Sequence, residues 1–153
     1  MLKVGDKAPA FTLLSDEGKE VALSNFKGQR VLLYFYPKAN TPGCTIEACE
    51  FRDARARFHK QDTVILGVSA DSPKTLAGFK KKQKLNFTLL SDPDFKMIES
   101  YGVRRMKKFM GREFLGIVRS TFLIGPTGRI EQIWDSVSAK GHAAETLAAV
   151  SAK

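Results

Sequence analysis

Runs of apolar residues alternate with amphipathic segments along most of this chain. The continuous apolar runs RVLLYFYP (30–37), TVILGVSA (63–70) and FTLLSD (87–92) are typical of strands that are buried on both faces. Between them, apolar residues spaced among charges predict helices from Cys44 to about Lys60 and from Ser72 to about Lys84. This order of strand, helix, strand, helix and strand predicts an α/β fold around a central sheet.

Both ends of the chain predict antiparallel strands. Near the N-terminus, AFTLL (10–14) and KEVAL (19–23) flank the turn SDEG and predict a β-hairpin. Near the C-terminus, strands at about 118–124 and 129–135 flank a Gly-Pro-Thr-Gly turn, and a helix closes the chain. We therefore expect a central mixed β-sheet flanked by helices, with an N-terminal β-hairpin.

Two shorter segments complete this outline. A short helix is expected over 93–102, where PDFKMIESYG ends in a glycine. The basic stretch RRMKKFMGREF that follows is interpreted as a loop.

Length and composition indicate one globular domain over residues 1–153. The hydrophobic fraction of 43% is ordinary for a chain of 153 residues that buries one core. The N-terminus reaches Asp6 without a long apolar run, so we expect no signal peptide, no transmembrane helix and no membrane partner. The default location is then the cytoplasm, where thiols stay reduced and two cysteines are more often catalytic or buried than bridged.

The charge balance is basic, with 25 Lys and Arg against 16 Asp and Glu and a formal net charge of +9. The charge is densest in FKKKQK (79–84) and VRRMKK (103–108), which are interpreted as solvated surfaces. A basic protein that binds nucleic acid or an anionic surface is the alternative, although no aromatic-interleaved RNA motif or zinc-finger spacing accompanies these stretches. The only histidines, His59 and His142, are read as a surface helix residue and a helix-start residue, so no metal site is expected.

The candidate chemistry lies in YPKANTPGCTIEACEF, which contains the only two cysteines, Cys44 and Cys49. Cys44 follows a buried strand and a loop and falls in the first turn of a helix, where unpaired N–H groups and the helix dipole favour an anion. Thr41 adds a hydroxyl just before it, and Pro37 and Gly43 stiffen and tighten the loop. A reactive thiolate is one interpretation of Cys44, and a buried structural cysteine is the other.

The spacing of the two cysteines sets a geometric problem. Five residues of an ideal helix rise about 7.5 Å and turn about 140°. Their Cα atoms would lie roughly 8–9 Å apart, beyond the limit of about 7 Å for a disulfide. A bond between Cys44 and Cys49 therefore requires the first turns of the helix to unwind, which local opening makes accessible. The alternative for Cys49 is a half-buried helical residue without chemistry.

The residues around Cys44 resemble those of the peroxiredoxins. PKANTPGC fits the active-site pattern Pro-x-x-x-Thr/Ser-x-x-Cys, and CTIEACEFRD resembles the helix of the peroxiredoxin Q group, also called bacterioferritin comigratory proteins. The resemblance continues in order through LGVSADS, FTLLSDPD, YGV, GIVRSTFLI and GHAAETL, and so covers nearly the whole chain. It implies a thioredoxin-like fold and thiol-dependent reduction of hydrogen peroxide and organic hydroperoxides, without a cofactor.

The resemblance also implies roles for individual residues. Cys44 would be the peroxidatic cysteine, which peroxide oxidises to a sulfenic acid, and Cys49 the resolving cysteine, which forms the disulfide. Thr41 would hydrogen-bond the peroxide, Pro37 would shield the sulfur from water, and Arg119 would stabilise the thiolate and hold the polarised peroxide. Without the resemblance, Arg119 reads only as a surface residue that enters a strand.

Two further residues belong to the expected site. The backbone N–H groups of Gly43 and Cys44 would contact the substrate oxygens. Glu47 matches the helix of the family, and it would either pair with a basic neighbour or cap the helix.

Partners and departures from the pattern follow from the same comparison. Thioredoxin or a similar dithiol protein would reduce the disulfide, and the resemblance implies a monomer or a weak dimer. Thr75 and Leu76 stand where a Ser-His pair is expected, and the basic segment after Val103 lacks the usual tryptophan. A thiol–disulfide oxidoreductase on the same fold is a second enzyme hypothesis, against which the absence of a CxxC motif counts.

Overall fold

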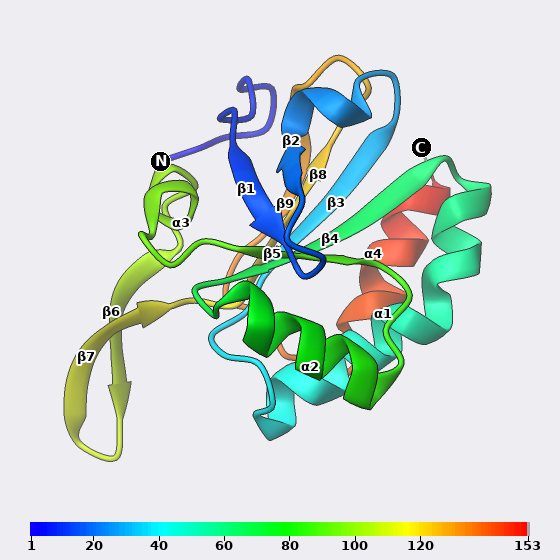
Figure 1. Ribbon diagram of the computed structural model, residues 1–153. Helices are drawn as coiled ribbons and strands as arrows, with labels where there is room; N and C mark the ends of the chain where they lie inside the picture. The colour runs from blue at the N-terminus through cyan, green and yellow to red at the C-terminus, as the bar shows by residue number, and fades with distance from the viewer. Residues whose placement is uncertain (153) are drawn as a thin grey trace.

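Figure 1 shows the computed structural model, which describes residues 1–152. Its centre is a seven-stranded mixed sheet with the strand order β2-β1-β5-β4-β3-β8-β9. The three central strands are parallel and the two strands at each edge are antiparallel, so the predicted mixed sheet and N-terminal hairpin are confirmed. The strands are β1 (Thr12–Ser15), β2 (Glu20–Ala22), β3 (Arg30–Phe35), β4 (Thr63–Ser69), β5 (Thr88–Ser91), β8 (Ser120–Ile124) and β9 (Ile130–Trp134).

Helices cover both faces of the sheet, which explains why its central strands are apolar throughout. On one face, Leu32, Tyr34 and Tyr36 pack into a core with side chains from three helices, α1 (Pro42–Lys60), α2 (Pro73–Gln83) and α4 (His142–Ser151). On the other face, Val31, Leu33 and Phe35 pack against α3 (Lys96–Ser100) and neighbouring segments. Successive residues of β3 therefore point into two different cores, both closed to water.

The helices begin and end close to the predicted positions. α1 begins at Pro42, two residues earlier than expected, and continues to Lys60 as one helix, so Cys44 and Cys49 share it. Ser72 caps α2, because its hydroxyl accepts a hydrogen bond from the N–H of Thr75 at 3.2 Å. α3 is shorter than predicted, and the 3₁₀ turn η1 (Leu23–Phe26) was not predicted. Within residues 1–152, no helix is both long and apolar enough to cross a bilayer.

The expectation of a loop after Val103 is wrong. The basic segment forms a two-stranded hairpin of β6 (Arg104–Phe109) and β7 (Arg112–Ile117), which projects from the body of the molecule in Figure 1. Met110 and Gly111 connect the strands with φ angles of 51° and 79°, and two positive φ angles are typical of the tightest hairpin turns. The strand signal was missed because two cations precede each apolar residue of β6, so the segment lacks the alternation of apolar and polar residues that predicts a strand.

Candidate active site

Cys44 lies where the loop after β3 enters α1. A residue outside the loop fixes its backbone, because the Ala39 N–H donates a hydrogen bond to an Asp71 carboxylate oxygen at 2.8 Å. Thr41 occupies the N-cap position without capping the helix, and its hydroxyl donates instead to the Lys38 carbonyl at 2.8 Å. Pro37 is half-buried at the start of the same loop. This path buries Cys44 to 1% exposure in the first turn of α1.

Arg119 reaches Cys44 from the segment between β7 and β8. Its Nη2 atom donates a hydrogen bond to the Cys44 Sγ atom at 3.4 Å. The Val137 N–H donates to the Arg119 carbonyl at 2.9 Å, which fixes the backbone at this point. The side chain is only 16% exposed, so the interpretation of Arg119 as a surface residue is wrong. Arg119 also lies just before β8 rather than inside the strand.

Glu47 holds Arg119 in place. It lies three residues after Cys44, on the same face of α1, and its Oε1 atom accepts a hydrogen bond from Arg119 Nη1 at 2.6 Å. Of the two roles considered for Glu47, pairing with a basic neighbour is therefore the one observed. The carboxylate is fully buried, and its Oε2 atom has no hydrogen-bond partner within residues 1–152.

The burial of Glu47 has an electrostatic consequence. Desolvation raises the pKa of its carboxyl group to about 7, although the Arg119 guanidinium opposes the shift. The group beside the thiol thus changes its protonation near neutral pH. Burial lowers the pKa of Arg119, but the neighbouring Glu47 carboxylate and Cys44 sulfur raise it by more. The pKa is therefore raised overall, and the guanidinium stays charged.

Gly43 gives the guanidinium room to approach. A Cβ atom at this position would lie 3.2 Å from Arg119 Nη2, closer than most side-chain contacts allow. The first N–H groups of a helix lack partners within the helix, and its dipole is positive at this end. The arrangement therefore combines a cation and free donors around one sulfur, which suits a negatively charged sulfur and negatively charged oxygen atoms.

Cys49 lies one turn and a half further along α1, in different surroundings. Both cysteines are free, and Cys49 is half-buried. Its thiol donates to the side-chain oxygen of Gln83 at 3.6 Å, and Arg52 Nη1 donates to the Gln83 carbonyl at 2.6 Å. The Asn86 side-chain amide donates a further hydrogen bond to the Arg52 carbonyl at 3.2 Å. Hydrogen bonds therefore hold the middle of α1 against the end of α2 and the residues that follow it.

No local pattern of residues identifies these neighbours of Cys49. Gln83 is 34 residues from Cys49 along the chain, and only the packing of α2 beside α1 brings the two together.

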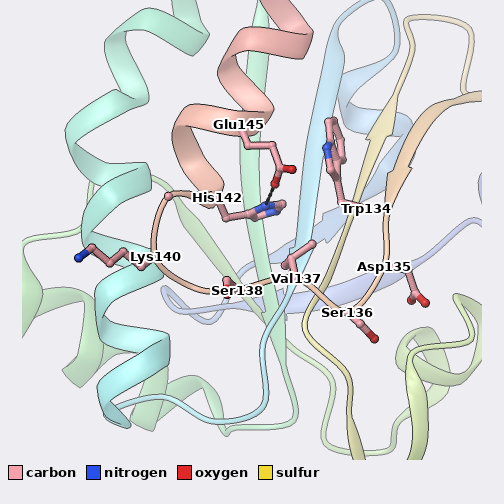
Figure 2. Close-up of a pocket in the computed structure, with 9 residues that line it drawn as sticks. Trp134, Asp135, Ser136, Val137, Ser138, Lys140, His142 and Glu145 are labelled. Atoms are coloured by element: carbon pink, nitrogen blue, oxygen red, sulfur yellow. Dashed lines mark hydrogen bonds and ion pairs between the residues drawn. The ribbon is translucent and has the colours of Figure 1, made fainter.

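A second polar cluster stabilises the start of α4. His142 begins the helix as predicted, and its side chain is buried. Its Nδ1 atom lies 2.9 Å from a Glu145 oxygen, as Figure 2 shows, and its Nε2 atom lies 2.7 Å from the Thr121 hydroxyl. A carboxylate can only accept, so Nδ1 carries the proton and Nε2 accepts from Thr121. Burial lowers the pKa of His142, which keeps the imidazole neutral.

Figure 2 also shows the open pocket beside this cluster. Its lining residues lie between Trp134 and Glu145 and include neither cysteine. Within residues 1–152, no group of three or more His, Cys, Asp or Glu side chains is placed to hold a metal ion.

Comparison with known proteins places the chain in a family. Residues 4–133 match the AhpC/TSA family. The putative peroxiredoxin bcp of Haemophilus influenzae is 53% identical over 141 residues, which cover 92% of this chain and 91% of that protein. Peroxiredoxin Bcp of Escherichia coli is 48% identical over 141 residues, covering 92% and 90%.

Solved structures agree with these relatives. PrxQ from Xylella fastidiosa superposes with a TM-score of 0.94 at 37% identity, covering 99% of this chain and 97% of that one. The bacterioferritin comigratory protein of Xanthomonas campestris, studied for its alkyl peroxide reduction activity, superposes with a TM-score of 0.88 at 39% identity, covering 93% and 90%. The predicted thioredoxin-like α/β fold is confirmed. The chain belongs to the AhpC/TSA family, and its relatives and fold place it among the peroxiredoxins of the Bcp or Q group.

Proposed function

We propose that this peroxiredoxin reduces hydrogen peroxide and organic hydroperoxides at Cys44 and is returned to its thiol form through Cys49. The observation that carries the proposal is one contact, the Arg119 guanidinium 3.4 Å from the Cys44 sulfur while Glu47 holds its other nitrogen. The names of the relatives support the thiol peroxidase activity. The assignment of roles to residues is our own.

In the first step, the Cys44 thiolate attacks the terminal oxygen of the peroxide. A sulfur–oxygen bond forms and the oxygen–oxygen bond breaks, and its electron pair leaves on water or an alcohol once a proton is taken up. Arg119 and the backbone N–H groups of Gly43 and Cys44 hold the charge that develops on the oxygens. The Thr41 hydroxyl already donates to the Lys38 carbonyl, so its oxygen is free to accept a hydrogen bond from the peroxide O–H.

Pro37 completes the surroundings of the sulfur in this scheme. It lies in the loop that leads into α1, where a ring without an N–H shields the thiolate from water.

In the second step, the Cys49 sulfur attacks the sulfenic sulfur of Cys44. A disulfide forms, the sulfur–oxygen bond breaks, and the oxygen leaves as water. In the intact helix the two Cα atoms lie roughly 8–9 Å apart, so the first turns of α1 unwind before the bond closes. The unbroken course of α1 through both residues supports this requirement.

In the third step, a dithiol protein such as thioredoxin reduces the disulfide and becomes oxidised itself. The electrons pass only through sulfur, so this route uses no metal and no cofactor. We place the protein in the cytoplasm, where both free cysteines would be kept reduced between turnovers.

The assignment is tested by intact mass after one equivalent of hydrogen peroxide is added to the fully reduced protein. We expect the wild type to lose two hydrogen atoms, Cys49→Ser to gain one oxygen atom, and Cys44→Ser to stay unmodified. Oxidation of Cys44→Ser as readily as the wild type would overturn the role of Cys44. A sulfenic acid that persists in the wild type would overturn the role of Cys49.

A further inference from the structure

The β6–β7 hairpin carries a concentration of exposed apolar side chains that the peroxide chemistry does not use. Five of the nine large hydrophobic residues that are exposed within residues 1–152 lie in this one hairpin. Each of the five is between 45% and 86% exposed. A cluster of this kind on a projecting element marks a surface that another molecule covers. The five are Met106, Phe109, Met110, Phe114 and Leu115.

The hairpin is also strongly cationic. Between Arg104 and Ile117 it holds five Lys or Arg residues and a single acid, Glu113. Arg104 and Arg105 are used internally, because they pair with Glu99 and Asp135. Lys108 and Arg112 are exposed and form no ion pair within residues 1–152. An apolar surface with a cationic rim complements an apolar surface with an acidic rim.

One face of the hairpin is turned toward the active site. The strand register places Lys107 opposite Phe114, and Phe109 opposite Arg112, on the same face. A Cβ atom on Gly116 would lie 3.0 Å from Lys107 Cδ, so the glycine lets the lysine lie flat. Its Nζ atom then donates to the Ile117 carbonyl at 2.9 Å, two residues before Arg119.

The electrostatics of Lys107 agree with this placement. Burial lowers the pKa of the ammonium group, the Arg119 guanidinium lowers it further, and the Cys44 sulfur opposes the shift. Lys107 therefore lies within electrostatic reach of both groups of the active site. In Figure 1 the hairpin extends toward the same end of the molecule as the first turn of α1.

We propose that the outer part of the β6–β7 hairpin, with Phe109 and Phe114 on this face and a cationic rim of Arg112 on the same face and Lys108 on the opposite one, is the docking surface for the dithiol protein that reduces the disulfide. The inference rests on the proposed function, since it requires a Cys44–Cys49 disulfide that a second protein must reach. A protein whose thiol attacks this disulfide at the N-terminal end of α1 must also contact the surfaces beside it. The partner defined by this surface carries exposed apolar residues and an acidic rim around its reactive thiol.

Two other occupants fit the surface less well. A second copy of this chain carries the same net charge of +9, so pairing through the hairpin would bring two cationic rims together. Nucleic acid would satisfy the cations, but its phosphate backbone offers no apolar surface to cover the exposed aliphatic side chains of Met106, Met110 and Leu115.

The first experiment compares two reductants in steady-state peroxide turnover: a thioredoxin of acidic net charge, and dithiothreitol, which needs no docking surface. For the double variant Phe109→Ser with Phe114→Ser, we expect the KM for thioredoxin to rise about ten-fold, as for loss of central interface residues. The rate supported by dithiothreitol should stay at the wild-type value, which also shows that the variant folds. An unchanged KM for thioredoxin would overturn the proposal.

A charge-matched pair tests the rim. Lys108→Gln with Arg112→Gln removes two charges from the hairpin, and Lys81→Gln with Lys82→Gln removes two exposed charges from α2. We expect the hairpin pair to raise the KM for thioredoxin about three- to five-fold and to weaken its salt dependence, while the α2 pair leaves both unchanged. Equal effects of the two pairs would mean that net charge alone attracts the reductant, and would overturn the proposal.

The outcomes separate this inference from the proposed function. If the wild type consumes no peroxide even with dithiothreitol, the proposed function fails and the docking surface fails with it. If dithiothreitol supports turnover and every hairpin variant matches the wild type with thioredoxin, only the docking surface fails. If sedimentation shows a wild-type dimer that the serine variants dissociate while the KM stays constant, the hairpin is a self-association surface instead.

Discussion

The two cysteines of α1 occupy contrasting surroundings within a single helix. Cys44 lies in the first turn, is 1% exposed, and its sulfur accepts a hydrogen bond from the charged Arg119. Cys49 lies in the interior of the helix, is half-buried, and its thiol donates to the neutral side chain of Gln83. The residue type is the same, so in the proposed mechanism the position in the helix and the neighbouring side chains suit the two sulfurs to different steps.

The regions of α1 around Cys44 and beyond Cys49 also differ in the hydrogen bonds that connect the helix to its neighbours. Beyond Cys49, α1 is tied to neighbouring elements, because Arg52 bonds the end of α2 and Glu50 accepts from the Gly141 N–H at 2.8 Å. Around Cys44, the ties are the side chains of Arg119 and Glu47, which are the groups that the chemistry itself perturbs. Unwinding is therefore expected to begin at the N-terminal end and to stop near Cys49.

The largest effect should come from the cation at Cys44. In Arg119→Lys the charge remains, but a single nitrogen cannot bond Glu47 and the Cys44 sulfur in the same fork geometry. We expect the rate of Cys44 oxidation to fall by about 10²–10³-fold, as for the loss of a preorganised donor. Rapid mixing of reduced protein with peroxide measures this rate. A lysine variant that reacts at the wild-type rate would show that charge alone, without fork geometry, activates Cys44.

The next effect concerns the buried acid of the same region. The folded pKa of Glu47, about 7, lies above its ordinary value of 4.5, so the folded state binds a proton more tightly than the unfolded state. The free energy of unfolding should therefore fall as the pH rises from about 4.5 to about 7, by up to roughly 3 kcal/mol.

Glu47→Gln removes this titration and serves as the comparison. Urea unfolding of both proteins at several pH values gives the difference between them. If the difference in the free energy of unfolding stays constant across this pH range, Glu47 is ionised throughout. The contrast between the regions around Cys44 and Cys49 would then be weaker.

A smaller effect is expected on the Cys49 side. Arg52→Met removes the charged bond that ties α1 to the Gln83 carbonyl next to the Cys49 thiol. We expect disulfide formation to slow about ten-fold, while oxidation of Cys44 keeps its wild-type rate. Quenching at timed intervals followed by intact mass separates the two steps. Arg55→Met, an exposed position one turn away, is the matched control, and equal slowing in both variants would remove the special role of Arg52.

The smallest effect should come from Gly43→Ala. The added Cβ would lie 3.2 Å from Arg119 Nη2, so the guanidinium must shift by a few tenths of an ångström. We expect about a three-fold loss in the rate of Cys44 oxidation with no change in disulfide closure. The same rapid-mixing measurement applies. A faster reaction of the alanine variant would show that the close approach of Arg119 to Gly43 does not limit the rate of Cys44 oxidation.

Much of the fold could be predicted because its signals are local. β3 and β4 are continuous apolar runs, and they are apolar because helices cover both faces of the sheet. The β6–β7 hairpin was missed for the opposite reason, since its strands are largely exposed to water and show neither a continuous apolar run nor a regular alternation of apolar and polar residues. Its turn carried one usable signal, Gly111, which adopts one of the two positive φ angles of the turn.

The candidate site divides in the same way. The surroundings of Cys44 in the loop and first turn could be inferred from a few consecutive residues. Arg119 is 75 residues away and was found only through a family resemblance, because no local pattern distinguishes it from a surface arginine. Gln83 had no such help, since only the packing of α2 beside α1 makes it a neighbour of Cys49, and the same packing brings Arg52 to the Gln83 carbonyl.

The central claim is that the start of α1 unwinds while the rest of the helix stays folded. Hydrogen exchange measured by mass spectrometry on the reduced and the disulfide forms tests it most directly. We predict that amides from Thr45 to Cys49 lose their protection in the disulfide form, while those from Phe51 to Lys60 keep it. Equal protection of the first turns in both forms, in a protein whose Cys44–Cys49 bond is verified by mass, would contradict the account.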